Sequence, residues 1–293
     1  MLRLLLSFAA LMLCIGAARA EVAVRDDSGQ WVRLAQPARR IVSLAPHMTE
    51  NLYAAGAGEY LVGAVEYSDY PEAALALPRV GGYTRVDLEA VMALRPDLVV
   101  VWQSGNAQAQ MAKLRALGVP LYVSQPNRIE DIAAELERLG TLAGREARAR
   151  DAAERFHARL AALRDEFSGR PPVRTFYQVW HRPLVTVGGA QIISAGLRLC
   201  GGDNVFESLP RLGHQVTVEA VIQANPEAIV ASGTGEGQPE SLDGWRRWQS
   251  ITAVRRDNLF FVPPPLIQRH TSRFLDGVEL LCRQLETARG RRP

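Results

Sequence analysis

The sequence predicts an α/β protein of two similar lobes, each with a mostly parallel sheet, joined by one long rigid helix. Three observations predict it. The stretch 86–101 is repeated at 216–231, strands alternate with helices in both halves, and a long amphipathic stretch separates the two copies. Alternation of this kind is typical of a parallel sheet covered by helices. A chain of 293 residues also fits two ordinary domains better than one.

The first 20 residues are expected to lie outside this fold, because they read as a secretory signal peptide. A basic start at Arg3 precedes an apolar core from Leu4 to Ile15, which is too short to span a bilayer comfortably. We expect cleavage after Ala20 and an exported, soluble mature chain. Cys14 is interpreted as discarded with the signal, since Leu13 is not the small residue that precedes a lipidated cysteine. Lipidation of Cys14 is the alternative.

The first lobe is expected to begin with an edge hairpin from 22–24 and 31–34, followed by a short buried strand at 41–44. We expect 45–48 to form a loop at the carboxyl end of this strand. Thr49 is then expected to cap a helix that stops at the glycines of 56–58. Apolar runs and helical spacing predict the remaining elements of the lobe. These are strands at 61–65, 98–102 and 121–124, and a helix at 129–142.

Each copy of the repeat reads as a helix followed by a buried strand. Both copies begin with a residue that can cap a helix, and both place an acid in the first turn, where the helix dipole favours it. In both, a proline ends the helix before a β-branched run. We therefore expect each lobe to display one acid at the same place. The paired positions, each 130 residues apart, are Asp87 and Thr217, Glu89 and Glu219, and Pro96 and Pro226.

The stretch from Arg145 to Phe167 is expected to be the connector between the lobes. Its apolar residues recur at helical spacing and form one stripe. A helix of this length would extend roughly 35 Å, enough to cross a small domain. We therefore divide the mature chain into an N-terminal lobe (21–143), a connecting helix (144–170) and a C-terminal lobe (171–293). The stripe consists of Ala149, Ala152, Ala153, Phe156, Leu160, Leu163 and Phe167.

The second lobe is expected to repeat the pattern of the first. Its strand–helix order follows from apolar runs, glycine stops and helical spacing. Outside the repeat, the expected strands are 174–179 and 259–262, and the expected helices are 191–199, 245–254 and 274–285. The expected loops are 180–183, a glycine-rich loop at 232–238, and a segment from Pro263 through His270.

Composition gives no support for nucleic-acid binding, because the net charge is only +3 and no basic run is interleaved with aromatic residues. An enzyme is also disfavoured, since no nucleophile elbow, phosphate loop or dinucleotide fingerprint occurs. The five histidines are scattered and form no His-x-x-x-His pair, so no metal site is predicted. An exported α/β enzyme remains the alternative class of function.

Ligand contacts are expected in the loops beyond the carboxyl ends of the strands, where open α/β sheets bind their ligands. These loops carry aromatic side chains from both lobes, which suits a large, flat, mostly apolar ligand with a polar rim. Packing is the alternative role of each aromatic residue, and it is the expected role of Trp245 and Trp248. The candidates are Pro46, His47, Tyr67, Tyr83, Trp102, Trp180 and the segment 264–270.

The mature chain has two cysteines, Cys200 and Cys282. Two cysteines in an oxidising compartment usually pair, so a disulfide is favoured over two buried free thiols. Such a bridge closes a loop of about 80 residues, which in the chain-entropy model stabilises the fold by roughly 4 kcal/mol.

Taken together, these segments resemble the periplasmic cobalamin (vitamin B12)-binding proteins of ABC importers, within the helical-backbone periplasmic binding protein family. The resemblance runs from about Arg40 to Leu285. The segments that carry it are Ile41–Pro46 with Thr49-Glu50, Tyr67–Pro71, Leu88-Glu89, Arg95–Val99, Trp102 with Gly105–Ala107, Cys200–Gly202 with Asn204–Phe206, and Cys282. The family has a tryptophan where Tyr83 stands and an acid and aromatics where this chain has Pro265-Leu266-Ile267.

The resemblance implies a periplasmic receptor with a ligand cleft between its lobes, no catalysis and no cofactor, cobalamin being the cargo. It implies a monomer that delivers cobalamin to the permease dimer of an ABC transporter without inserting into the membrane. Glu89 and Glu219 would dock onto arginines of the permease, and Cys200 would pair with Cys282. The implied cobalamin contacts are Tyr67, Tyr83, Trp102, Leu266, Ile267 and Arg269.

A haem or ferric-siderophore receptor of the same family is the alternative. Haem would require an axial histidine or tyrosine, and a siderophore would require arginines that face the cleft. The residues that could serve haem are His47, Tyr67 and His214, and those that could serve a siderophore are Arg85, Arg182 and Arg269.

Overall fold

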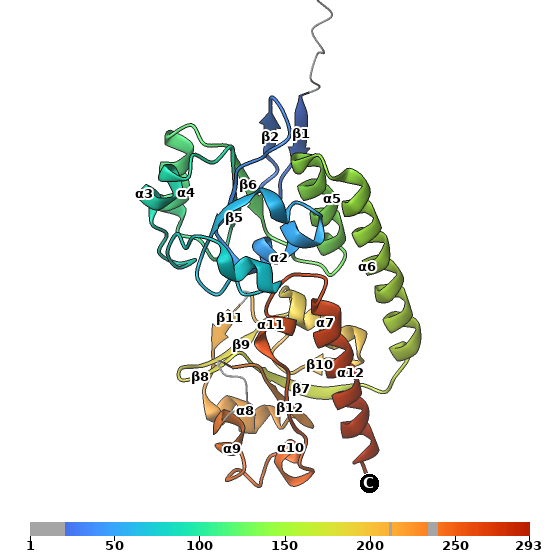
Figure 1. Cartoon of the computed structure of the whole chain (residues 1–293). Helices are drawn as coiled ribbons and strands as arrows, with labels where there is room; N and C mark the ends of the chain where they lie inside the picture. The colour runs from blue at the N-terminus through green and yellow to red at the C-terminus, as the bar shows by residue number, and fades with distance from the viewer. Residues whose placement is uncertain (1–20, 211–212, 234–239) are drawn as a thin grey trace, which may run out of the picture.

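A computed structural model describes residues 21–210, 213–233 and 240–293 of the chain. The described residues form the two α/β lobes that the sequence predicts (Figure 1). The predicted signal peptide with its cleavage site and Cys14 lies outside the described residues, as does most of the predicted glycine-rich loop at 232–238. In the described part of the chain, no helix has both the length and the apolar character needed to cross a bilayer.

Each lobe is built on a four-stranded sheet in which every neighbouring pair of strands is parallel. In both sheets the second strand along the chain lies outside the first, and the third and fourth follow on the other side. The two lobes therefore share one topology, which confirms the predicted fold class. The N-terminal sheet has the order β4 (Leu61–Ala64), β3 (Ile41–Ser43), β5 (Leu98–Trp102), β6 (Leu121–Ser124). The C-terminal sheet has the order β10 (Gly202–Asn204), β7 (Val173–Gln178), β12 (Ala228–Ala231), β13 (Leu259–Phe261).

The repeated stretches form equivalent units, α3 (Leu88–Ala93) before β5 and α8 (Val218–Ala224) before β12. In each, the side chain of the N-cap residue accepts a hydrogen bond from the backbone N–H three residues later. The residue before each proline is left-handed, with φ of 45° at Arg95 and 42° at Asn225. This conformation turns the chain sharply out of the helix and into the strand.

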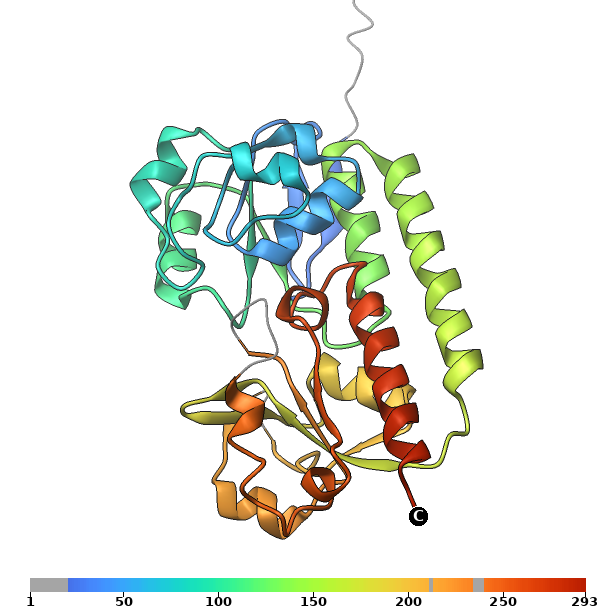
Figure 2. The same cartoon turned by 60° about the horizontal axis from the view of Figure 1, so that its bottom comes forward.

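The connector is α6 (Glu146–Phe167), which follows α5 (Asp131–Ala143) after a left-handed turn at Gly144. All seven residues of the predicted stripe are buried. The first two alanines of the stripe pack in the core of the N-terminal lobe, and the five residues from Ala153 onward pack in the core of the C-terminal lobe. Figures 1 and 2 show α6 passing along one side of both lobes. The lobe boundaries at 143 and 171 stay a prediction.

The predicted loop at 45–48 is wrong, because helix α2 (Pro46–Ala54) begins at Pro46 with Ala45 as its N-cap. The fixed φ of proline suits the first position of a helix, where its missing N–H costs nothing. Thr49 therefore lies inside the helix, and its hydroxyl donates to Ser43 Oγ at 2.9 Å. The helix ends before Gly56, which has φ of 80°, as the glycine signal predicted.

The C-terminal lobe contains a second sheet that the sequence did not predict. It is antiparallel and has the order β11 (Gly213–Gln215), β9 (Leu184–Val187), β8 (Trp180–His181). The predicted loop at 180–183 is therefore wrong at its first two residues, which form β8. Strands this short carry too few residues to show an alternating pattern.

Two further corrections fall in the C-terminal lobe. The predicted helix at 245–254 is replaced by α9 (Glu240–Asp243) and α10 (Thr252–Arg255). The chain turns between them because Trp245 packs edge-to-face on Phe176 and donates its Nε1–H to Gln178 Oε1 at 2.8 Å. Residues 264–267 form a short helix, α11 (Pro264–Ile267), where a loop was expected.

The remaining elements agree with the predicted pattern or are short additions to it. The antiparallel edge hairpin and the closing helix are confirmed. The remaining bounds are β1 (Val22–Arg25), β2 (Trp31–Leu34), η2 (Gly58–Tyr60), η3 (Glu72–Ala76), α4 (Gln108–Ala116), α7 (Ile192–Leu199) and α12 (Phe274–Gly290).

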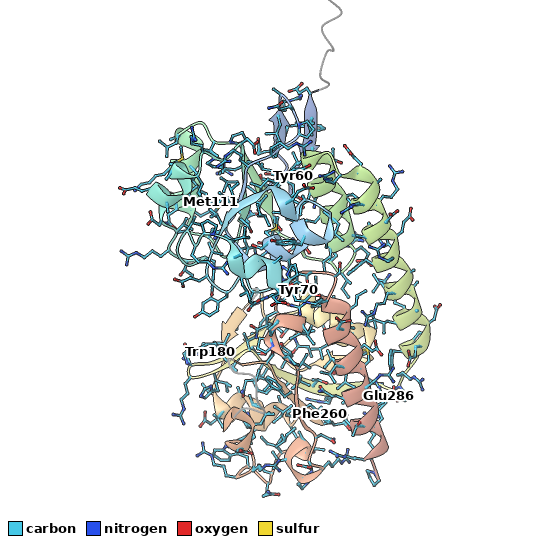
Figure 3. All side chains as sticks on the ribbon, in the orientation of Figure 1. Tyr60, Tyr70, Met111, Trp180, Phe260 and Glu286 are labelled. Atoms are coloured by element: carbon cyan, nitrogen blue, oxygen red, sulfur yellow. A yellow bond between two sulfur atoms is a disulfide. The ribbon has the colours of Figure 1, made fainter. Side chains whose placement is uncertain are left out.

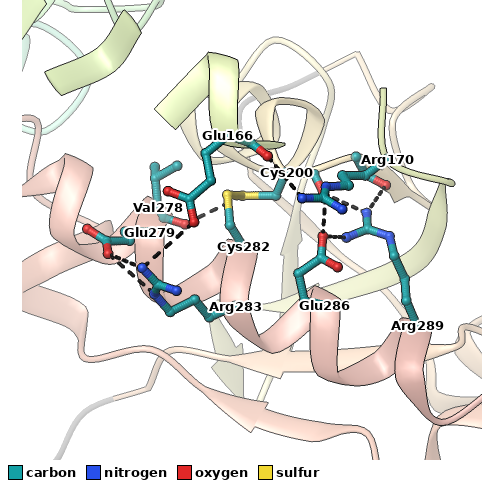
Figure 4. The surroundings of a disulfide bond; sticks show 10 residues. Glu166, Arg170, Cys200, Val278, Glu279, Cys282, Arg283, Glu286 and Arg289 are labelled. Atoms are coloured by element: carbon teal, nitrogen blue, oxygen red, sulfur yellow. Dashed lines mark hydrogen bonds and ion pairs between the residues drawn. A yellow bond between two sulfur atoms is a disulfide. The ribbon is translucent and has the colours of Figure 1, made fainter. Parts of the chain in front are cut away.

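The predicted disulfide is present and joins Cys200, at the carboxyl end of α7, to Cys282 in the middle of α12. Both cysteines are fully buried. Figure 4 shows ion pairs flanking the bridge, including Arg289 with Glu286 at 2.7 Å. The bridge therefore fastens the last helix of the chain to the core of the C-terminal lobe.

Cys200→Ser is expected to lower the free energy of unfolding, because the bridge joins residues 82 positions apart. A loss of about 2–4 kcal/mol is expected, the typical contribution of a disulfide and at most the roughly 4 kcal/mol of the chain-entropy model. Urea unfolding of the variant and of the wild type, each with and without reductant, measures it. Reductant should destabilise only the wild type, and equal stability of the two oxidised proteins would contradict the prediction.

Candidate functional site

The loops at the carboxyl ends of the N-terminal sheet are tied together by one buried side chain, Asn106. Its Oδ1 accepts from the backbone N–H of Trp102 at 2.6 Å. Its Nδ2 donates to the carbonyl of Leu44 at 2.8 Å and to that of Tyr83 at 2.7 Å. Because a buried amide is satisfied only when these partners stay in place, Asn106 fixes the three loops relative to one another.

The position of the Trp102 ring depends on Gly105. The Cβ that any other residue would add at Gly105 would lie 1.8 Å from Cε3 of Trp102. A side chain there would therefore push the indole out of its place. The Gly105-Asn106 pair is thus the local signal that positions Trp102 at the end of β5.

Four aromatic rings meet where the two lobes face each other. The ring centroid of Trp102 lies 5.3 Å from that of His47, 6.0 Å from that of Tyr83 and 6.3 Å from that of His270. The two histidine rings are 5.4 Å apart. The structure therefore brings together three predicted residues of the N-terminal lobe and His270, the last residue of the predicted segment 264–270 of the C-terminal lobe.

A cavity of about 230 Å³ adjoins this cluster and lies between the lobes. Trp102 and His270 contribute to its wall. The N-terminal lobe supplies polar loop residues, and the C-terminal lobe supplies aliphatic and amide side chains. Its described lining is Trp102, Ser104, Gln125, Pro126, Asn127, Val179, Val185, Val187, Gln191, Ile192, Ile193, Gly213, Gln268 and His270.

Burial keeps both histidines of the cluster neutral at pH 7. It lowers the pKa of His270 to about 4. Burial also holds the pKa of His47 well below its ordinary value, and repulsion from Arg269, and from His270 when that ring is protonated, lowers it further. Each imidazole therefore presents one donor and one acceptor at neutral pH.

Residues 269–273 of the C-terminal lobe are bound to the N-terminal lobe by a network of charged groups. Arg269 pairs with Asp69 at 2.5 Å and donates to the carbonyl of Tyr67 at 2.9 Å. Arg273 donates to both carboxylate oxygens of the buried Glu50, at 2.8 and 3.1 Å. Arg273 also lies over the ring of Tyr70, which Figure 3 shows at the level where the lobes meet.

A second polar contact joins the lobes at His270. Asn51 in α2 donates to the carbonyl of His270 at 2.9 Å and to Glu135 Oε2 at 2.6 Å. Burial raises the pKa of Glu135 to about 7, and the charge of Asp27 adds to this, while the hydrogen bond from Asn51 opposes it. The backbone that carries His270 is thus held by a side chain of the other lobe.

Other predicted ligand residues lie apart from the four-ring cluster. Tyr67 is 70% exposed and has φ of 63°. Trp180 is 40% exposed, donates Nε1–H to the carbonyl of Arg182, and lies at the edge of the C-terminal lobe (Figure 3). Pro46 is half-buried. Their part in ligand binding stays a prediction.

The predicted residues of the 264–270 segment occupy different environments. Leu266 is half-buried, whereas the side chain of Ile267 is fully buried in the core of the C-terminal lobe. Arg269 points its guanidinium at Asp69 and Tyr67. In this structure the side chains of Ile267 and Arg269 are thus engaged within the protein, and their predicted contacts with a ligand stay untested.

Glu89 and Glu219 occupy equivalent positions, each the second residue of its helix. Both are exposed, and neither forms an ion pair with a described residue. Figure 1 shows α3 and α8 on the side of the molecule opposite α6, one on each lobe. The two acids are therefore free to meet a partner that spans both lobes.

The described residues contain no group of three or more histidine, cysteine, aspartate or glutamate side chains that could hold a metal ion. Asn106, which builds the site, was not among the predicted ligand residues, and His270 was predicted only as the last residue of the segment 264–270. Asn106 had a signal in the Gly105-Asn106 motif. For His270, the only signal in the sequence was its place at the end of a proline-rich segment, because the residue of α2 that it contacts lies more than 200 positions away.

Comparisons with known proteins agree with this architecture. The family model described as "Periplasmic binding protein" matches residues 41–266. A protein of Vibrio cholerae serotype O1 named "Vitamin B12-binding protein" is 38% identical over 253 residues, covering 86% of this chain and 91% of the relative.

Two solved structures have the same fold. The crystal structure of the periplasmic vitamin B12 binding protein BtuF of Vibrio cholerae superposes with a TM-score of 0.80 at 37% identity, covering 86% of this chain and 98% of that one. The periplasmic heme-binding protein RhuT from Roseiflexus sp. RS-1 superposes with a TM-score of 0.74 at 24% identity, covering 85% and 99%. At that lower identity the likeness concerns the fold alone.

Proposed function

The chain belongs to the periplasmic binding protein family, and we propose that it captures cobalamin (vitamin B12) and delivers it to the permease dimer of an ABC transporter. The relatives named for vitamin B12 binding support this ligand, since they match most of the chain at 36–38% identity. The observation that carries the proposal is the four-ring cluster beside the interlobe cavity. Aromatic faces and aliphatic walls suit a large ring-shaped ligand, and amide side chains suit its polar rim.

In the proposed role, the protein is a receptor without catalytic activity or a cofactor, and cobalamin is its cargo. It acts as a monomer in the periplasm after cleavage behind Ala20, and the mature chain stays outside the membrane. The mature chain would consist of the lobes 21–143 and 171–293 with the connecting helix 144–170 between them. Membership of a family of transport binding proteins supports this description.

The proposed ligand contacts lie around the mouth and floor of the cleft. Tyr83, Trp102 and His47 would contact one face of the corrin ring from the N-terminal lobe. Tyr67 and Trp180 are exposed and can close over the ligand from the rim. The proposed set is completed by Pro46, Leu266, Ile267 and Arg269. The side chains of Ile267 and Arg269 are engaged within the protein in this structure.

The proposed docking contacts are Glu89 and Glu219. As helix-start acids they would contribute only about 0.3–1 kcal/mol each through the dipole. That role explains the residue type but not its recurrence at the same position of both lobes. A permease with two-fold symmetry could receive both acids in one pair of basic pockets. Charge complementarity of this kind fixes the orientation of the receptor and speeds encounter.

Haem is the second candidate ligand, and the paired His47 and His270 favour it. Both are neutral and one comes from each lobe, so either could act as an axial ligand to iron. A ferric siderophore has less support, because Arg269 is already paired with Asp69.

We expect the mature protein to bind cyanocobalamin at one molecule per chain, because two lobes form one cleft. A dissociation constant below about 1 μM, which corresponds to a binding free energy of about −8 kcal/mol or more negative, is expected for a scavenging receptor. Calorimetric titration with cyanocobalamin, hemin and a ferric siderophore compares the candidates directly. Tight hemin binding without cobalamin binding would replace the proposal by the second candidate.

Trp102→Ala is expected to weaken cobalamin binding by about 1–3 kcal/mol, the range for removing a buried aromatic contact at the centre of a binding site. Trp31→Ala is the matched control, since Trp31 is 59% exposed on β2. Calorimetry on both folded variants measures the difference. If the two variants bind alike, Trp102 serves packing and not the ligand.

The double variant Glu89→Arg, Glu219→Arg is expected to abolish cobalamin uptake and leave the affinity for cobalamin nearly unchanged. Breaking one desolvated charge pair costs about 2–5 kcal/mol of docking energy, so each single variant should also be impaired. Cobalamin-dependent growth and calorimetry of the same proteins separate the two effects. Glu146→Arg is the matched control, an exposed first-turn acid on α6. Normal growth of the double variant would show that the two glutamates do not dock the permease and only stabilise their helices through the dipole.

A further inference from the structure

Three ring nitrogens of the four-ring cluster are buried without a hydrogen-bond partner among the described residues, and two of the three rings, Trp102 and His270, line the adjoining cavity. The nitrogens are Nε2 of His47, Nε1 of Trp102 and Nδ1 of His270. His47 and His270 are only 4% and 5% exposed. The three rings touch one another, and they come from α2, from the end of β5 and from the segment after α11. Buried polar groups in native proteins are nearly always paired, so this group of nitrogens calls for a partner from outside the chain.

The cavity beside these nitrogens carries no formal charge in its wall. None of the described residues that line it is aspartate, glutamate, lysine or arginine. Four of them are amides, Gln125, Asn127, Gln191 and Gln268. Arg269, the residue before His270, is not in the described lining and is paired with Asp69. Along the described lining, a group that enters this cavity therefore meets donors and acceptors but no charged side chain.

The three rings together offer hydrogen-bond donors and acceptors that suit a neutral amide group. Trp102 Nε1 can only donate, whereas a neutral imidazole offers one donor and one acceptor. Burial lowers the pKa of both histidines, so both are neutral at pH 7. A primary carboxamide, with one oxygen and two N–H donors, can satisfy this set. A carboxylate can only accept, and it would lose its hydration without meeting a cation.

We propose that His47, Trp102 and His270 form a subsite for a carboxamide arm of the ligand, and that it rejects a carboxylate at the same place. The inference rests on the proposed function, because the corrin ring of cobalamin carries carboxamide arms on its rim. Haem carries carboxylate arms instead. The proposed subsite would therefore favour cobalamin, which carries amide arms, over haem, which carries carboxylate arms.

The test compares cyanocobalamin with its monocarboxylic acids, in each of which one peripheral amide is hydrolysed. Calorimetry on the wild type is expected to show at least one acid bound about 10-fold more weakly or worse, as for sites whose buried polar groups lose a partner. Equal affinity for cyanocobalamin and all the acids would overturn the subsite while leaving the proposed function intact. Absence of cyanocobalamin binding by folded protein would overturn the proposed function and the subsite with it.

Variants of His270 test whether this residue causes the discrimination between cyanocobalamin and the acid. His270→Leu is expected to weaken cyanocobalamin binding about 10-fold and to reduce the discrimination against the acid, whereas His270→Asn keeps a donor and an acceptor and should retain both. His157→Leu, on the exposed face of α6, is the control and should match the wild type. Thermal unfolding checks that each variant is folded. Unaltered discrimination in folded His270→Leu would remove His270 from the subsite.

Gln191→Arg provides a test in the opposite direction, because it adds a cation to the wall of the cavity. For the acid that the wild type binds weakly, the ratio of its affinity to that for cyanocobalamin is expected to be higher in this variant than in the wild type. A ratio that stays at the wild-type value would show that the neutral wall does not set the preference, and would overturn the inference.

Discussion

The pairing of Glu50 across the lobe boundary is the interaction on which the cleft depends. Glu50 is buried in α2, and it accepts hydrogen bonds from Arg273 and from Thr271 of the other lobe. Removing one partner from a buried ion pair typically costs about 3–5 kcal/mol, because the remaining charge is left without solvent or counter-charge. The segment 269–273 is therefore held against α2, and that contact carries His270 to the rings of His47 and Trp102.

Two of the links between the described parts of the lobes pre-form the binding site. Helix α6 contributes one link, since its buried stripe packs into the cores of both lobes. The network around Glu50 contributes the other, on the side of α2. Two links restrict the relative rotation of the lobes more than a single connector would. A cleft that is already assembled loses less conformational freedom when a ligand binds.

The two lobes share a topology but contribute different chemistry. Their sheets have the same strand order, and their repeated helices begin with the same cap and acid. The segments around this shared framework differ, and they include the small antiparallel sheet of the C-terminal lobe. The N-terminal loops, fixed by Asn106, supply aromatic rings, while the C-terminal lobe supplies aliphatic and amide walls from its small antiparallel sheet and α7. The shared framework supplies rigidity, and recognition comes from loops that diverged on it.

The sequence by itself determined the features that depend on neighbours along the chain. The two-lobe α/β class, the repeated unit, the stripe of α6 and the pairing of the two cysteines were predicted from spacing, caps and composition. The start of α2 has a local signal in Pro46 that the prediction missed. The pairing of β11 with β9, the anchoring role of Asn106 and the position of His270 were decided by the tertiary structure. Each depends on residues far apart in the sequence, and periodicity carries no record of such contacts. The carbonyl of His270 lies 219 positions from the Asn51 side chain that holds it, so only the folded chain brings the two together.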